Sequence, residues 1–422
     1  MIGSILFNGN IQHEEDFIYR FKDRILQSNH IDPSVRESKK ALLITGAWGQ
    51  EEYNESHVKD ALRKIGIASK YKDGFDENIQ NLAVYHEWQE FYKRHPHVKE
   101  IYEKSLDSLF LIKKFYQEKN AELIELLRKH TRMVKQQFRY ISLADILSYS
   151  IQDEEWQIPQ MDDRQLLKHY SCEEIQKTLS FLIGGDDLQT KISQEIQEYA
   201  KIKSGVVGNP AYQKRRKELI DRILSSNSIF IFGGYVSWLY YSLKFWDLEH
   251  ALSEALMRGA NFYTVSAGSI VLCQKIIVYN DFLKSEGERK RNFEFFDNGL
   301  GLVTKIKLFP HCRDRIHTDD PDNLAYLAHR FQGRVCVGLN EESFLLLDAH
   351  YGPNGRLYPR FTSLGEKDAV YVFDPSGQKV KVYKGDQIMV PGTQIWEERN
   401  KAQGGPDKRA LYEGETLWSG KG

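Results

Sequence analysis

The sequence predicts an α/β protein with an open, mostly parallel sheet and flanking helices, interrupted by a large all-helical insertion. Short apolar runs near both ends of the chain are each followed by a turn and an amphipathic segment, the pattern of βαβ units. Between them, the stretch from Phe75 to Ile158 contains no glycine and one proline, Pro96. Its apolar residues recur at mostly helical steps, with charges of both signs on the other faces.

The first part of the chain has a βαβ pattern. Residues 2–9 predict a strand and turn, and the apolar spacing over 16–27 predicts a helix. Residues 41–46 predict a buried strand, and 53–65 an amphipathic helix that ends at Gly66. We therefore assign residues 1–71 to the first part of the α/β domain.

The insertion is predicted to span residues 72–226 as a set of long helices, with an antiparallel hairpin as one arrangement. Later helices are expected near 163–181 and 188–202, with Gly184-Gly185 in a loop between them. An insertion is tolerated where its ends lie close together, so we expect a separate helical subdomain between two strands. Its apolar stripes are mostly core, and a partner-binding or dimer face is the alternative.

The α/β domain is predicted to resume over residues 227–400, followed by a loose tail at 401–422. A strand at 228–232 precedes a helix at 248–258 and a second strand at 260–265. Further strands are expected at 301–308, 335–339, 343–347 and 370–373, and the last of these forms a hairpin with 379–383.

Composition sets limits on the class of protein. The 422 residues carry 58 basic and 59 acidic side chains, so no overall field favours nucleic acid or a membrane surface. The four cysteines form no C-x-x-C pair, and His95 and His97 are a lone close pair of histidines, so we expect no metal and no cofactor. No basic-then-apolar leader and no long apolar run is present, which predicts a cytoplasmic protein.

The most informative motif is Val265-Ser266-Ala267-Gly268, which follows the strand at 260–265 and precedes a helix-compatible run. A serine at such a strand–turn–helix junction is raised above the sheet as a nucleophile elbow. Small residues suit the turn, and the backbone N–H of Ala267 would point toward the same place as the hydroxyl. A buried serine in an ordinary βα turn is the alternative.

A histidine and a glutamate occupy two later strand ends. His311 follows the run at 301–308, and Glu341 follows the strand at 335–339. Acyl transfer needs a hydroxyl, an imidazole that moves its proton and a carboxylate that orients the imidazole. Glu341 is the favoured acid, because Glu342 would point to the other side of the strand; Asp281 is a weaker candidate.

Four motifs in this order resemble the peptidase E (dipeptidase E) and cyanophycinase family of serine peptidases, whose sheet is similar to that of class I glutamine amidotransferases. The motifs are Gly233-Gly234 after a strand, the Ser266-Ala267-Gly268 elbow, a Gly-Leu-Gly-Leu segment at 299–302 ahead of the histidine, and residues 338–341. The resemblance covers residues 228–347. It implies Ser266 as nucleophile, His311 as base, Glu341 as orienting acid, and oxyanion N–H groups from Gly234 and Ala267.

The sequence departs from the family pattern at positions that bear on the substrate. Tyr235 stands where a polar substrate-contacting residue is usual, and Thr264 replaces a glycine. Arg313 and Arg315 follow the histidine and could bind a substrate carboxylate through their planar guanidinium groups, or could be solvated.

The sequence thus predicts a serine hydrolase that cleaves a peptide or isopeptide bond. A catalytically altered binding or signalling module on the same fold, with the helical insertion as its partner-binding element, is the alternative. A glutamine-amidotransferase-like enzyme is disfavoured because the elbow carries a serine rather than a cysteine. We expect a homodimer as one possible assembly, and no nucleic-acid or membrane partner.

Overall fold

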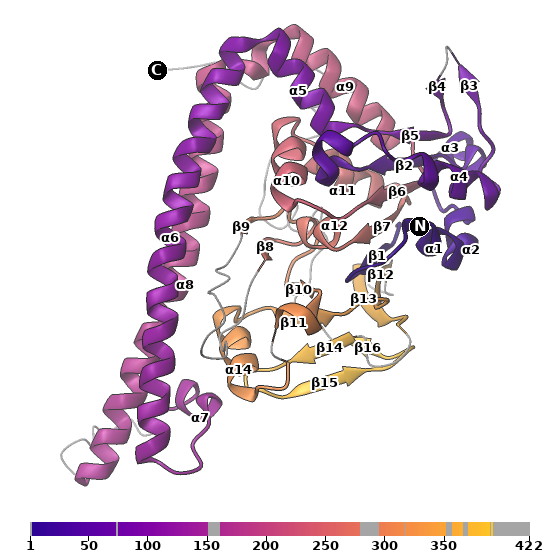
Figure 1. The fold of residues 1–422 in the computed structure, drawn as a ribbon. Helices are drawn as coiled ribbons and strands as arrows, with labels where there is room; N and C mark the ends of the chain where they lie inside the picture. The colour runs from indigo at the N-terminus through magenta and orange to yellow at the C-terminus, as the bar shows by residue number, and fades with distance from the viewer. Residues whose placement is uncertain are drawn as a thin grey trace.

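The computed structural model describes residues 2–72, 75–150, 161–278, 295–316, 318–351, 357–365, 370–388 and 390. Within these residues the largest sheet has eight strands, in a mixed α/β arrangement with helices on both faces (Figure 1). In spatial order the strands are β16 (Gln387–Ile388), β13 (Leu357–Ser363), β12 (Phe344–Tyr351), β1 (Ile5–Asn8), β7 (Asn261–Val265), β6 (Ser228–Ile231), β2 (Ala41–Ile44) and β5 (Ile79–Asn81).

The five strands from β1 to β5 in that order are parallel, and the antiparallel strands β12, β13 and β16 extend one edge. Side chains alternate between the two faces of the sheet, as the period of two requires. On β1, Ile5 and Phe7 belong to one apolar core and Leu6 to the other. The predicted parallel α/β architecture is confirmed, and both faces of its central strands are buried.

Helices of the first part of the chain pack on the Leu6 face of the sheet, and most later helices of the domain pack on the opposite face. Instead of one helix over 16–27, the chain forms two short helices that meet at Phe21. The first group is α1 (Glu14–Arg20), α2 (Lys22–Leu26) and α4 (Ser56–Lys64); α3 (Pro33–Ser38) precedes β2, and a 3-10 segment at Gly46–Glu51 packs against α5 and α10 of the second group. The second is α5 (Val84–Arg94), α9 (Pro210–Leu224), α10 (Val236–Phe245), α11 (Glu249–Met257) and α12 (Ala267–Val271).

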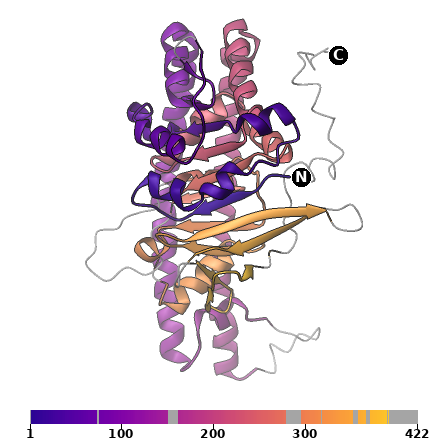
Figure 2. The same ribbon diagram turned by 90° about the vertical axis from the view of Figure 1, so that its right-hand side faces the viewer.

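A second, four-stranded sheet lies beside the first, as Figures 1 and 2 show. Its strands are β10 (Ile306–Pro310), β11 (Val335–Leu339), β14 (Val370–Phe373) and β15 (Lys379–Val382), and the predicted β14–β15 hairpin is confirmed. β10 and β11 are parallel, so the residues that follow them leave the sheet at one edge. Smaller strand pairs are β3 (Tyr71–Lys72) with β4 (Phe75–Asp76), and β8 (Lys275–Val278) with β9 (Phe295–Asn298); the short helices α13 (Cys312–Arg315) and α14 (Pro321–Arg330) follow β10.

The helical insertion is dominated by two antiparallel helices, α6 (Pro96–Gln137) and α8 (Asp163–Ser204), which we call the hairpin. Each has 42 residues and so a length of about 63 Å, and the pair runs along one side of the whole molecule (Figure 1). The short helix α7 (Leu143–Leu147) lies at one end. Gly184-Gly185 lies inside α8, so the predicted helix–helix loop at this point is wrong.

The hairpin shares a core with the α/β domain and does not stand apart from it. Leu127 of α6 and Leu182 of α8 belong to one apolar cluster with Phe309 of β10 and Leu327 of α14. The predicted insertion range also contains a strand of the main sheet, because β5 pairs in parallel with β2.

Buried polar groups fix the hairpin to the domain. The Arg330 guanidinium of α14 donates to both carboxylate oxygens of Asp186 on α8, at 2.8 and 2.7 Å. Lys113 of α6 donates at 2.8 Å, and Ser193 of α8 at 2.6 Å, to the same oxygen of Asp297 on β9. Charge-assisted pairs of this kind are directional, so they set the position of the hairpin on the domain. Among the described helices, none is long and apolar enough to span a bilayer.

Candidate active site

Ser266 stands at the junction between β7 and α12, as the sequence predicts for an elbow. Its backbone has φ 47° and ψ −108°, a conformation that a non-glycine residue rarely adopts. The turn is held by three backbone bonds: Ser266 N–H donates to the Asn8 carbonyl at 3.0 Å, and the N–H groups of Ser269 and Ile270 donate to the Ser266 carbonyl at 3.0 and 3.2 Å. The surrounding structure therefore maintains a strained backbone at the one residue proposed as nucleophile.

A buried hydroxyl network under the elbow supports this turn. The hydroxyls of Thr264 and Ser269 lie 2.9 Å apart; Thr264 also donates to the Leu6 carbonyl at 3.1 Å, and Ser269 to the Asn8 carbonyl at 2.9 Å. The Asn8 side-chain amide donates at 2.8 Å to the Ser343 carbonyl. The network joins β7, α12, β1 and the start of β12, and it gives a structural reason for threonine at position 264.

Sequence reasoning did not identify Asn8 or Ser269 as part of this site. The available signals are an asparagine at the end of an apolar strand and a serine one turn after the elbow. Both are common in turns and helix starts, and only the parallel pairing of Asn8 with Val265 brings them together.

Three glycines allow the backbone to approach Ser266 closely. A methyl group at Gly268 would lie 2.1 Å from the Ile231 carbonyl oxygen, and one at Gly233 would lie 2.9 Å from Ser266 Cβ. Gly234 has φ 135°, and its methyl group would lie 2.6 Å from the Ala47 carbonyl oxygen. The Gly-Gly turn after β6 and the elbow are therefore packed backbone against backbone.

His311 follows β10 directly, and its Nε2 lies 2.9 Å from Ser266 Oγ. The predicted contact between these two side chains is confirmed. His311 also has a left-handed backbone, with φ 54°, at the start of α13. Both residues are half-buried, so the pair is reachable from solvent.

The predicted oxyanion donors are the N–H groups of Gly234 and Ala267; Ala267 follows Ser266 directly, and Gly234 follows Gly233, whose added methyl group would lie 2.9 Å from Ser266 Cβ. The Ala267 nitrogen lies 3.6 Å from the Cβ position of Gly233, so the Gly-Gly turn adjoins the start of α12. Among the described residues, neither Gly234 nor Ala267 donates its N–H to a backbone acceptor. The first N–H groups of a helix have no partner inside the helix, which suits Ala267 to hold a negative oxygen.

The third member of the predicted triad makes no such contact. Glu341 follows β11 and forms an isolated bridge with Asn10, beyond the end of β1. Its side chain is exposed, and no hydrogen bond or ion pair joins its carboxylate to His311, both residues being described. Glu342 is paired with Arg20 at 2.9 Å, and Asp281 lies outside the described residues.

Of the predicted substrate-contacting residues, Tyr235 is exposed directly after the Gly-Gly turn, and its ring lies 4.4 Å from that of Trp238. Arg315 is half-buried in α13, close in sequence to His311. The side chain of Arg313 lies outside the described part of the structure.

One group of potential metal ligands occurs among the described residues: Glu14, Glu15 and His57 place ligand atoms within 4.8 Å of one another. All three are half-buried, and His57 is already paired with Glu14 at 3.5 Å and stacked on Trp48. Nothing else points to an ion there, and we assign no metal site. The expectation that the protein uses neither metal nor cofactor stays a prediction.

Residues 187–351 match the family described as Peptidase family S51. The search of curated proteins gave no match. Among solved structures, the chain is similar to the crystal structure of a peptidase from an acI-B1 Actinobacterium, with 12% identity and a TM-score of 0.41, over 92% of this chain and 97% of that one.

The S51 match includes all four motifs on which the predicted resemblance depends: Gly233-Gly234, the Ser266 elbow, the segment before His311 and residues 338–341. It also begins inside α8, so it covers the last part of the hairpin. The family match supports the general function of a serine peptidase. The predicted resemblance is therefore confirmed: residues 187–351 of this chain, which carry the Ser266–His311 pair, match peptidase family S51.

Proposed function

We propose that this protein is a serine hydrolase that cleaves a peptide or isopeptide bond with Ser266 as nucleophile and His311 as general base. The observation that carries the proposal is the 2.9 Å contact between Ser266 Oγ and His311 Nε2, with Ser266 held in a strained elbow. That distance lies within the range in which an imidazole can take a proton from a hydroxyl.

In the proposed reaction, Ser266 Oγ attacks the carbonyl carbon of the scissile bond while His311 Nε2 takes the hydroxyl proton. The N–H groups of Gly234 and Ala267 bind the oxygen of the tetrahedral intermediate. The protonated imidazole then donates its proton to the leaving amine, which releases it and leaves an acyl-Ser266. Water, deprotonated by His311, hydrolyses this ester and restores the serine. Each N–H donor of such a site contributes on the order of 3 kcal/mol to transition-state stabilisation.

Glu341 remains our proposal for the acid that orients His311. Its carboxylate makes no hydrogen bond to His311 in this structure, but catalytic hydrogen bonds are often long without substrate. The bridge between Glu341 and Asn10 holds this strand end beside the end of β1, which is bonded to the elbow. A methyl group at Gly9 would lie 2.4 Å from the Leu339 carbonyl oxygen, so the two chain segments are tightly packed there.

The nucleophile is tested by screening dipeptides and isopeptides with wild-type protein and Ser266→Ala side by side. We expect loss of all hydrolysis in the variant with an unchanged circular dichroism spectrum, because one oxygen is removed. A fluorophosphonate probe should label the wild type and not the variant. Equal turnover of any substrate by both proteins would contradict the proposal.

The acid is tested with three matched substitutions: Glu341→Gln, Glu342→Gln and Asp281→Asn. If Glu341 orients His311, Glu341→Gln alone should lower kcat by orders of magnitude with little change in KM, since the loss of an orienting acid affects the transition state. A comparable loss in Asp281→Asn, with Glu341→Gln near wild type, would transfer the role to Asp281.

The proposed contribution of arginine to substrate binding is also testable. If Arg313 and Arg315 bind a substrate carboxylate, Arg315→Gln should raise KM for substrates with a free carboxylate and leave their amidated forms unaffected, because the guanidinium then has no anionic partner. An equal effect on both forms would show that Arg315 acts on the fold instead.

A further inference from the structure

The outer surface of the hairpin carries large apolar side chains that are exposed. On α6 they include Leu111, Phe115, Leu126 and Met133, and on α8 Tyr170, Phe181, Leu188 and Tyr199. Phe115 is 69% exposed and Phe181 70% exposed. We call these eight side chains the outer stripe.

The members of the outer stripe lie on one flank of each helix. At 100° per residue, the four residues of α6 fall within about 60° of one another, and the four of α8 within about 20°. Spacings of four, seven and eleven residues, as here, keep side chains along one line of a helix. Phe110 is equally exposed, at 68%, but lies about 140° around α6 from Phe115 and so belongs to another flank.

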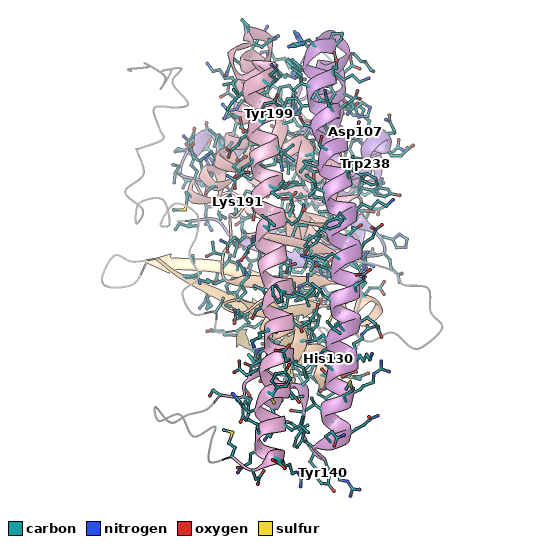
Figure 3. The ribbon with its side chains drawn as sticks, turned by 90° about the vertical axis from the view of Figure 1, so that its left-hand side faces the viewer. Asp107, His130, Tyr140, Lys191, Tyr199 and Trp238 are labelled. Carbon is teal, nitrogen blue, oxygen red and sulfur yellow. The ribbon has the colours of Figure 1, made fainter. Side chains whose placement is uncertain are left out.

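These two flanks meet at the seam between the helices. Lys119, one turn beyond Phe115, reaches α8, because a methyl group at Gly185 would lie 2.5 Å from its Nζ. The hydroxyl of Tyr116 is bonded to Asp186, which fixes the relative height of the two antiparallel helices. Phe115 therefore lies at the height of Leu188, and Met133 near that of Tyr170. In Figure 3 the two helices lie side by side in front of the domain, with Tyr199 and Lys191 labelled on α8.

Gly184 lies in the middle of α8 and is exposed between Phe181 and Leu188. A methyl group there would meet no atom of the described residues within 4 Å, whereas one at Gly185 would meet Lys119. A glycine inside a helix costs about 1 kcal/mol relative to alanine, and contacts among the described residues do not account for this one. A glycine between two large side chains forms a depression into which a side chain of another helix can fit.

Near the stripe, two pairs of charges at equal heights on the two helices have opposite signs, and a third pair, Asp107 on α6 and Glu195 on α8, has like signs. Lys104 on α6 lies near the height of Glu198 on α8, and Glu125 near that of Lys177. All four side chains are exposed. If α6 of one copy lay over α8 of another copy, these two pairs would bring opposite charges together across the interface, against one like-charge pair at Asp107 and Glu195.

We propose that the outer stripe is the interface of a homodimer, in which the hairpins of two copies of this chain pack face to face about a two-fold axis near Phe115 and Gly184. An axis along the seam, parallel to the helices, places α6 of one copy over α8 of the other at equal heights, so a stripe shared by both helices pairs with itself. Two antiparallel hairpins packed in this way form a four-helix bundle.

The exposed area is sufficient for such an interface. The four aromatic members offer about 150–250 Å² each, so at their exposures they alone present roughly 500 Å², to which the three leucines and the methionine add. A stable dimer buries about 800 Å² per partner, and a patch on a monomer is usually smaller, about 300–600 Å². Of the three charge pairs, two complement each other across such an interface, which favours a second copy over an unrelated helix.

The test is the molar mass of the full chain in solution by light scattering over a wide range of concentrations. We expect the wild type to have twice the 49.2 kDa of one chain. Phe115→Glu and Leu188→Glu, one on each helix, should each halve the mass, because they place like charges opposite each other across the two-fold axis. Phe110→Glu is the matched control and should leave the mass unchanged.

Circular dichroism of each variant separates loss of the dimer from loss of the fold, and the milder Phe115→Ser provides a second variant should the charged one unfold. A wild type that stays monomeric at every concentration would overturn the proposal. So would a dimer that survives both stripe variants, or one that Phe110→Glu dissociates equally well. None of these readouts depends on catalysis, so failure of the proposed hydrolase function would leave them intact.

Discussion

The molecule has one Gly-Gly pair in the turn beside the elbow and another in the hairpin, and the two pairs have different surroundings. Gly233-Gly234 follows β6, where methyl groups would collide with Ser266 Cβ and with the Ala47 carbonyl oxygen. Gly184-Gly185 lies inside α8, where one methyl group would meet open space and the other the end of a lysine side chain. In the elbow, backbone packing requires the glycines, whereas in the hairpin a continuous helix tolerates them.

This comparison shows why a dipeptide pattern alone does not decide a structure. A glycine costs a helix about 1 kcal/mol, so two of them cannot break a helix whose other forty residues form it and whose ends are well capped. Asp162 and Gln165 form a capping box at the start of α8, and Gly205 ends it in the left-handed conformation, with φ 62°. Gly233-Gly234 does not lie inside a helix, and the geometry of this turn is set by contacts with residues distant in sequence.

The largest expected effect on catalysis is that of Gly233→Ala. The added methyl group would lie 2.9 Å from Ser266 Cβ and 3.1 Å from the Val265 carbonyl oxygen, neither of which can move without displacing the elbow. We expect kcat/KM to fall by about 100-fold or more, because a displacement of 1 Å at a nucleophile has that effect. The control is Gly185→Ala, which meets only a flexible lysine and should retain full activity.

Measuring hydrolysis and fluorophosphonate labelling of both variants checks this contrast. If Gly233→Ala labelled as fast as wild type, the close backbone packing at the elbow would have no catalytic role.

The same contrast shows how much of the site was predictable from sequence. Ser266 and His311 could be predicted because each directly follows an apolar strand, although their strands, β7 and β10, belong to different sheets. The sequence does not distinguish Glu341 from Glu342 as the acid, because the direction of each side chain depends on where the chain turns after β11. The parallel sheet was recognised from buried runs, but the docking of the hairpin depends on polar residues distant in sequence, such as Asp186 and Arg330.

Asp186→Ala tests whether the hairpin depends on its polar contact with the domain. The Arg330 side chain is fully buried, and Asp186 is its anionic partner. Removal of one member of a buried ion pair leaves an uncompensated charge, so we expect the free energy of unfolding to fall by about 3–5 kcal/mol. Denaturant unfolding measures this loss.

Asp187→Ala is the matched control, because its side chain is 74% exposed and lies 3.8 Å from Lys275. We expect a change of less than about 1 kcal/mol, as for exposed ion pairs. Equal losses in the two variants would show that the buried pair does not anchor the hairpin.

A pH dependence of stability is expected from Lys307, which lies on β10, the strand before His311. Burial lowers the pKa of this lysine to about 7, and its Nζ donates to the Lys275 carbonyl at 2.9 Å. The pKa in the folded state is below that of the unfolded chain, so between pH 7 and the unfolded pKa the unfolded state binds more protons. The stability contributed by Lys307 therefore rises with pH across this range, by about 2 kcal/mol from pH 7 to pH 9.

Replacing the lysine by methionine should remove this part of the pH dependence. The measurement is the difference in the free energy of unfolding between wild type and Lys307→Met at several pH values, which cancels the contributions of other groups. A difference that stays constant from pH 7 to pH 9 would show that Lys307 is protonated in the folded protein throughout.

The smallest expected effect is that of Gly184→Ala. This substitution tests most directly the role of the glycine pair in the hairpin. At concentrations where the chain is monomeric, the substitution should raise the free energy of unfolding by about 0.5–1 kcal/mol, because alanine is the better helix former and the methyl group meets open space. If a second copy packs against Gly184, the same methyl group should weaken the dimer and lower the apparent stability at high concentration. Denaturant unfolding of wild type and variant at both concentrations provides the measurement. A gain of the same size at both would show that nothing packs on this face of α8, and that the glycine there is only a tolerated defect of the helix.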